Sequence, residues 1–214
     1  MRKIIIIFLI FITEFSLNAQ GIGNFAPEKE SSVFPPNAWG VDIMFGEGGF
    51  GLGAFYRKNI SQDFTLFTDF SISEAKDEKE IEYIDYWGRP YVIGKQNRIF
   101  LLPLNFGAQY RLFREDLSDN LRPYINFGIG PSMVVTTPYE KEFFSSFKDA
   151  RFSITAGAYI GVGANFGLDQ SKLFGINLRY YFIKFFNDGV EGLKDRYIKN
   201  LGGFYITINV GAMY

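Results

Sequence analysis

The side chains that perform most enzyme chemistry are missing from this 214-residue sequence, which contains no histidine and no cysteine. Without His there is no Ser–His triad, imidazole base or His-ligated metal, and without Cys there is no thiolate nucleophile and no disulfide. The neighbouring acids Asp77 and Glu78 could bind Ca²⁺, but their spacing matches no calcium-loop pattern. We therefore expect no enzymatic activity, no catalytic residue, no metal site and no cofactor.

Charged and amide side chains that interrupt apolar or glycine-rich stretches could instead form a polar network. Asp69 and Arg179 each lie five residues beyond an aromatic residue that begins such a stretch. Because an isolated charge in apolar surroundings is costly, we expect Arg179 to pair with Asp69 or Asp42. The alternative to a structural plug is a path for protons or solutes. The predicted network comprises Asp42, Asp69, Asn105, Arg111, Asn177 and Arg179.

The elements that must position these residues are indicated by apolar side chains at every second position. Eight segments show this alternation, at residues 39–46, 50–57, 64–73, 102–111, 124–130, 153–166, 174–182 and 203–214. A period of two predicts strands, and no apolar run after residue 20 approaches the ~18–20 residues of a membrane helix. An even number of strands of about ten residues is typical of an antiparallel barrel that spans a bilayer.

The two faces of the segments distinguish a membrane barrel from a soluble one. The apolar face carries no charged residue in any segment, whereas the other face carries Gly, Ser, Thr, Asn, Tyr, Arg and Asp. A soluble lipocalin-like barrel would have large apolar side chains inside and charges outside. The sequence therefore predicts an all-β fold, an eight-stranded antiparallel transmembrane up-and-down β-barrel whose narrow lumen holds the polar side chains.

Aromatic residues mark one end of this predicted barrel. With the chain entering from the periplasm, seven of the eight strands carry an outward aromatic residue at their periplasmic ends, as an interfacial girdle requires. These residues are Trp39, Tyr56, Phe64, Tyr110, Phe166, Phe174 and Tyr214. The predicted turns at that end are shorter than three of the four outer loops.

The first nineteen residues have the layout of a secretory signal peptide. Arg2 and Lys3 precede an apolar run over 4–12, and Ala19 is the expected cleavage site. A membrane anchor is the alternative, but nine apolar residues in a helix span only about 13 Å of a ~30 Å hydrocarbon core. Residues 20–37 contain three prolines and no periodicity, which predicts a flexible periplasmic segment before a barrel at 38–214.

Two outer loops are rich in aromatic residues. They can be solvated hairpins, or they can form a contact surface for a protein partner or lipopolysaccharide. The phenylalanines of the second loop are expected to pack on aromatic residues of the first or to lie at the lipid boundary. The predicted surface consists of Tyr83, Tyr86, Trp87, Tyr91, Phe143, Phe144 and Phe147.

The stretches Leu-Arg-Pro-Tyr-Ile-Asn-Phe-Gly-Ile-Gly at 121–130 and Gly-Ile-Asn-Leu-Arg-Tyr-Tyr-Phe at 175–182 resemble those of bacterial outer-membrane β-barrel domains. The last strand also resembles theirs, with an aromatic end preceded by apolar residues at alternate positions. The resemblance is to small barrels of the OmpA, OmpX and OmpW type, and it implies that the last strand is read as an assembly signal. The residues that match this signal are Tyr214, Ala212, Val210 and Ile208.

The resemblance implies a porin-like integral protein of the Gram-negative cell outer membrane. Its expected partners are membrane lipid, lipopolysaccharide, the barrel-assembly machinery and a protein bound through the outer loops. Nucleic acid is not expected, because the net charge is −1. We expect a non-enzymatic structural, surface-interaction or accessory role. The alternatives are a narrow transport barrel for small hydrophobic molecules and a subunit of a larger export or assembly complex.

Overall fold

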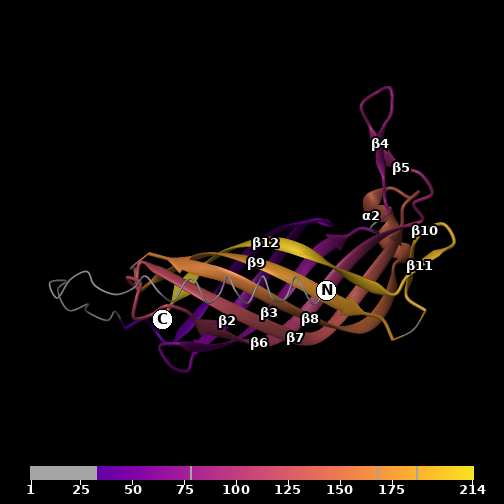
Figure 1. Ribbon diagram of the computed structural model, residues 1–214. Helices are drawn as coiled ribbons and strands as arrows, with labels where there is room; N and C mark the ends of the chain where they lie inside the picture. The colour runs from indigo at the N-terminus through magenta and orange to yellow at the C-terminus, as the bar shows by residue number, and fades with distance from the viewer. Residues whose placement is uncertain (1–32, 78, 168, 187) are drawn as a thin grey trace, which may run out of the picture. The chain divides into compact units, whose positions relative to one another are not determined.

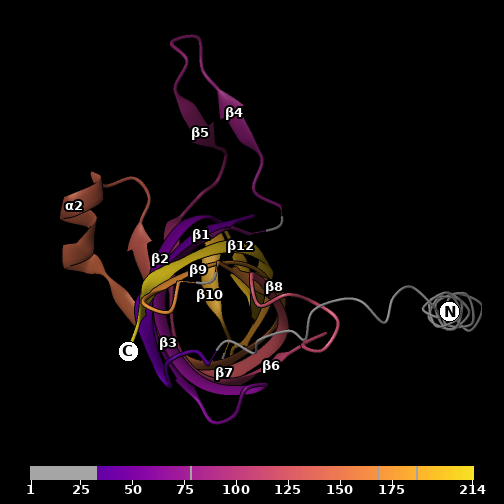
Figure 2. The same ribbon diagram turned by 90° about the vertical axis from the view of Figure 1, so that its left-hand side faces the viewer.

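The computed structural model describes residues 33–77, 79–167, 169–186 and 188–214. The predicted signal peptide at 1–19 and most of the segment at 20–37 lie outside these residues. Eight strands pair antiparallel and close into a barrel in the order β1-β12-β9-β8-β7-β6-β3-β2 (Figures 1 and 2). The prediction of an all-β eight-stranded antiparallel barrel is therefore confirmed.

Each barrel strand contains one of the segments with alternating apolar residues. The strands are β1 Asn37–Gly46, β2 Gly49–Asn59, β3 Phe64–Ala75, β6 Asn97–Arg111, β7 Leu121–Pro138, β8 Arg151–Phe166, β9 Lys172–Lys184 and β12 Asn200–Met213. The observed β6 begins five residues before its predicted segment, and β7 continues eight residues beyond its own. These extensions carry a mixture of polar and apolar side chains, so the alternation that predicts a strand is lost there.

The two ends of the barrel differ in their connections (Figure 1). What we call the loop end carries the hairpin of β4 (Glu82–Ile84) and β5 (Pro90–Val92), together with a short helical segment and the hairpin of β10 (Val190–Leu193) and β11 (Arg196–Ile198). The helical segment consists of α2 (Phe143–Ser146) and the 3₁₀ helix η1 (Phe147–Asp149). The other end, which we call the turn end, has the short connections 60–63, 112–120 and 167–171.

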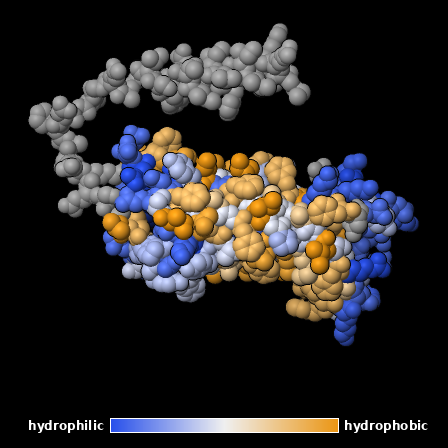
Figure 3. All heavy atoms as spheres, turned by 90° about the horizontal axis from the view of Figure 1, so that it is seen from below, coloured by the Kyte–Doolittle hydropathy of each residue, from blue (hydrophilic) through white to orange (hydrophobic). Residues whose placement is uncertain are grey.

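The outside of the barrel is an apolar belt between two hydrophilic ends (Figure 3). Outward side chains such as Val41, Leu52, Phe106 and Ile160 are exposed although they are apolar. The seven predicted girdle aromatics are all exposed, and they lie near the turn end. Among the described residues, no helix is long and apolar enough to cross a bilayer.

The lumen holds three layers of side chains. Near the loop end lies an apolar cluster of Ala75, Ile99, Leu101, Val134, Ile183, Phe185, Val190 and Leu201. The middle layer consists of Met44, Phe67, Tyr159, Tyr181 and Tyr205. Near the turn end lie Ala38, Phe55, Leu173 and Met213, with Phe34 packed against them. An eight-stranded barrel is just wide enough for its side chains to fill it, and these layers do so.

The hairpin β10–β11 folds back over the barrel at the loop end. The backbone N–H of Gln96 donates to the carbonyl of Gly192 at 2.9 Å, and that of Lys194 donates to the carbonyl of Gly94 at 2.8 Å. The Asn97 amide donates to the Glu191 carbonyl at 2.8 Å. These bonds hold β10 against β6 and place its Val190 in the apolar layer.

Candidate functional site

The centre of the lumen is a buried charge network built around Arg179. This guanidinium, on β9, lies 3.0 Å from the carboxylate of Asp42 on β1 and 3.6 Å from that of Asp69 on β3. All three side chains are at most 3% exposed. Since β3 and β9 are not neighbours in the barrel, Arg179 reaches across the lumen. It lies beside both Asp42 and Asp69, the two acids that the sequence offered as alternative partners.

Neutral donors complete the coordination of the two carboxylates. Asp69 accepts hydrogen bonds from the Asn105 amide at 2.8 Å and from the Tyr159 hydroxyl at 2.9 Å. Asp42 accepts one from the Asn209 amide at 2.5 Å. With one cation, two carboxylates and several fixed donors from six strands, the arrangement is a cross-brace of the barrel wall.

Two residues of the predicted network lie apart from this cross-brace. Arg111, on β6 at the turn end, pairs with Asp119 at 2.6 Å. Asn177 is fully buried in the lumen, but its side chain has no hydrogen-bond partner among the described residues. The structure therefore joins Asp42, Asp69, Asn105 and Arg179 into one network, and it leaves these two outside.

The sequence prediction missed the tyrosines and the asparagine that complete the network. Tyr159 stacks with Phe67, and the Tyr181 hydroxyl accepts a hydrogen bond from Arg179 at 3.4 Å. The Tyr124 hydroxyl donates to Asn209 at 3.3 Å. All of them occupy the inward register of their strands. The alternation places them in the lumen, but it does not show which of them meet across it.

Outside the lumen, the hairpin β4–β5 presents exposed aromatic residues at the loop end. Tyr83 and Tyr91 lie opposite each other on the two strands, with ring centroids 5.8 Å apart. At the tip, Tyr86 is 96% exposed and Trp87 is 77% exposed. The carboxylate of Asp85 accepts hydrogen bonds from the backbone N–H groups of the tip, which fixes the turn that displays these rings.

The three phenylalanines of the second loop form a separate cluster. Phe143 and Phe147 pack on Phe100 of β6, with ring centroids 6.2 and 5.7 Å away, and Phe144 packs on Phe143 at 5.3 Å. Among the residues that the structure describes, no ring contact joins this cluster to the aromatic residues of β4–β5. The predicted contact surface is thus two patches at the loop end.

The four residues of the predicted assembly signal lie at the seam where the barrel closes. On β12, Ile208, Val210 and Ala212 pair with β1 and direct their side chains outward. The backbone of Tyr214 exchanges two hydrogen bonds with that of Asn37, at 2.9 and 3.1 Å. Recognition by an assembly machinery remains a prediction.

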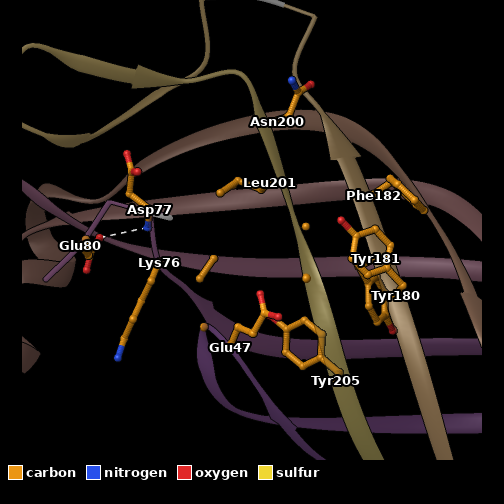
Figure 4. Close-up of a pocket in the computed structure, with 14 residues that line it drawn as sticks. Glu47, Lys76, Asp77, Glu80, Tyr180, Tyr181, Phe182, Asn200, Leu201 and Tyr205 are labelled. Carbon is orange, nitrogen blue, oxygen red and sulfur yellow. Dashed lines mark hydrogen bonds between the residues drawn. The ribbon is translucent and has the colours of Figure 1, made fainter. Parts of the chain in front are cut away.

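A cavity of about 450 Å³ opens in the barrel wall at the loop end (Figure 4). It lies on the loop-end side of the short β1–β2 hairpin, between the loop-end parts of β12 and β3. Its lining includes Glu47, Lys76, Tyr181 and Tyr205. Groups of three or more metal-binding side chains do not occur among the described residues.

No protein-family model matches the sequence, and no curated protein matches it. Among solved structures, the chain is similar to Neisserial surface protein A, with a TM-score of 0.52 and 12% identity over 83% of this chain and 95% of that one. The N-terminal β-barrel domain of Pseudomonas aeruginosa OprF gives a TM-score of 0.44 and 13% identity, over 83% and 97% of the two chains. The chain has the fold of the small eight-stranded outer-membrane β-barrels.

Proposed function

We propose that this chain is an integral β-barrel of the bacterial outer membrane, exported with a cleaved signal peptide, that acts by surface contact and catalyses no reaction. The observation that supports this proposal most directly is the combination of an apolar belt with an ordered, exposed hairpin at one end. A continuous belt of uncharged side chains is stable only against lipid. Exposed Tyr and Trp on a fixed turn favour contact with another molecule.

The filled lumen favours contact over conduction. The apolar layer, the charge network and the turn-end cluster follow one another along the barrel axis, and β10 adds Val190 to the apolar layer at the loop end. A solute would have to displace the ion pairs of Arg179 to pass. In planar bilayers we expect the purified barrel to show no single-channel steps, and clear steps would favour the transport alternative.

Membrane topology can be tested with single cysteines, because the natural chain has none. We expect Tyr86→Cys at the loop end to react with a membrane-impermeant maleimide on intact cells. The matched variant Glu115→Cys, also exposed but at the turn end, should react only after the outer membrane is permeabilised. Equal labelling of both variants on intact cells would contradict the proposed orientation.

Surface contact can be tested at the tip of β4–β5. A photo-crosslinking amino acid in place of Tyr86 should give a defined adduct with a protein or lipopolysaccharide in living cells. The control places the same group at Glu115, at the other end of the barrel. If position 86 gives no adduct beyond this control, the contact role of the hairpin is wrong.

A further inference from the structure

The cavity in the wall exists because two strands stop early. The ladder between β1 and β12 ends at the pair Gly46 and Tyr205, and the N–H of Glu47 makes one more bond to the carbonyl of Phe204. Beyond that point β12 continues to Asn200 paired with β9 alone. On the other side, β3 rises past the last residue that pairs with β2. The wall is therefore notched above the β1–β2 hairpin.

Because the notch interrupts the wall, the cavity is lined from both faces of the sheet. Tyr181 and Tyr205 are buried lumen residues, whereas Tyr180 and Phe182 direct their rings outward. The outer rings form an edge-to-face group, with the Tyr180 centroid 4.5 Å from Phe182 and 4.6 Å from Phe204. The cavity thus connects the part of the lumen lined by Tyr181 and Tyr205 with the apolar belt, and its volume lies within the range of small-molecule sites.

The edge of β12 offers backbone groups to an occupant of the cavity. Since the carbonyl of Phe204 is directed toward β1, the alternation of an antiparallel strand directs the N–H and C=O of Gly202 the same way. Gly202 and Gly203 carry no side chain that would cover this edge. A methyl group at Gly203 would lie 3.4 Å from Oε2 of Glu47, so this carboxylate is beside the glycine edge.

The charges that line the cavity are mostly negative. Three carboxylates and one ammonium group line it. Glu80 is paired with Lys95 at 2.8 Å and Asp77 with Arg196 at 2.9 Å. The remaining acid, Glu47, has no basic side chain within ion-pair distance among the described residues.

The single lining ammonium belongs to Lys76, which lies 4.0 Å from the carboxylate of Glu82. In Figure 4 its side chain extends away from the tyrosines. The cavity therefore has an acid and aromatic rings on one side, with the lining cation directed elsewhere.

We propose that this cavity binds an amphipathic organic amine that enters from the bilayer. The ammonium group lies beside Glu47 and the carbonyl of Gly202, where its three N–H donors find acceptors. Tyr181 and Tyr205 offer ring faces to the cation, and the apolar body of the ligand packs on Tyr180 and Phe182. Entry from lipid rests on the proposed membrane location, but the binding chemistry does not rest on contact through β4–β5.

The test uses the full folded barrel in lipid nanodiscs, titrated with 4-phenylbutylamine and separately with the neutral 4-phenylbutanol. Amide NMR signals of Gly48, Gly202 and Gly203 report on the cavity, and empty nanodiscs correct for partition into lipid. We expect these signals to shift saturably with the amine. The alcohol should bind at least about fivefold more weakly than the amine. Equal affinities, or shifts that do not saturate, would overturn the proposal.

Substitutions of Glu47 and Lys76 should have opposite effects on amine binding. Glu47→Gln should weaken amine binding by about fivefold and leave alcohol binding unchanged. The control Glu140→Gln, which changes an exposed acid on another loop, should affect neither ligand. Lys76→Met removes the one positive charge that lines the cavity, and with it the repulsion of a bound ammonium group, so it should strengthen amine binding. If Lys76→Met has no effect and Glu47→Gln binds as tightly as the natural chain, the ammonium site is wrong. Cysteine labelling reports topology separately, so a failed membrane location is distinguishable from a failed ligand class.

Discussion

Replacing Arg179 with methionine is the sharpest test of the cross-brace in the lumen. Methionine is a long, neutral side chain that fills much of the space of arginine. The substitution would leave the carboxylates of Asp42 and Asp69 without a cation, although each is at most 3% exposed. Removing one partner of a buried ion pair typically costs about 3–5 kcal/mol, because the other charge remains buried.

The hydrogen-bond donors that remain around the two carboxylates decide how large the loss of stability should be. Asp69 keeps its bonds from Asn105 and Tyr159, and Asp42 keeps its bond from Asn209. Since these bonds still stabilise the carboxylates, we expect Arg179→Met to lower the free energy of unfolding by about 3 kcal/mol. Neutralising both acids as well, with Asp42→Asn and Asp69→Asn, should recover most of this loss.

The measurement is equilibrium unfolding in urea with the barrel in phospholipid vesicles. The emission of Trp39, which faces outward and is 57% exposed, reports the transition in a Trp87→Phe background. A loss below about 1 kcal/mol for Arg179→Met, or a triple variant no more stable than the single one, would refute the cross-brace.

Three further substitutions test other parts of the structure. Gly107→Ala should destabilise the barrel by about 1–3 kcal/mol in the same unfolding assay, because the added methyl group would lie 2.4 Å from the Phe67 ring; an unchanged midpoint would contradict this packing. Glu142 caps α2, and backbone N–H bonds from Ser145 and Phe144 hold its pKa below the usual value. The contribution of Glu142 is therefore present above the pKa of the unfolded chain and is lost as pH falls through the lower folded pKa. The protection factors of the amides in 143–146, which compare observed with intrinsic exchange at the same pH, should therefore fall at acidic pH in the natural chain and at pH 7 in Glu142→Gln. Trp87→Ala should change the unfolding free energy by less than about 0.5 kcal/mol, because the ring is 77% exposed, and a larger loss would mean that the tip packs on the barrel.

The barrel could be predicted from sequence because its outer face is so uniform. Residues such as Val210, Ile208 and Ile206 on β12 recur with period two and without any charge. That periodicity fixes both the strand and the face that meets lipid. The loop-end parts of β6 and β7 could not be predicted in this way. There both faces carry a mixture of polar and apolar side chains, so the alternation that contact with lipid requires is absent.

The lumen network could be predicted only in part. The sequence places Asp42, Asp69 and Arg179 inside, and the cost of an unpaired buried charge predicts that they meet. Which neutral residues join them depends on the stagger of the strands, which brings Tyr159 to Asp69 although 90 residues separate them. The wall cavity could not be predicted at all, because it results from the unequal height of neighbouring strands.

The closing ladder between β1 and β12 has a consequence for the order of folding. Every other pairing in the barrel joins strands that are consecutive among the eight, so each forms as a local hairpin with little loss of chain entropy. The β1–β12 ladder joins Ala38 to Met213 and has by far the longest loop to close. The contact of Asp42 with Arg179 also spans 137 positions. A half-built sheet would therefore expose unpaired charges toward lipid, so membrane insertion and closure are expected to occur as one concerted event.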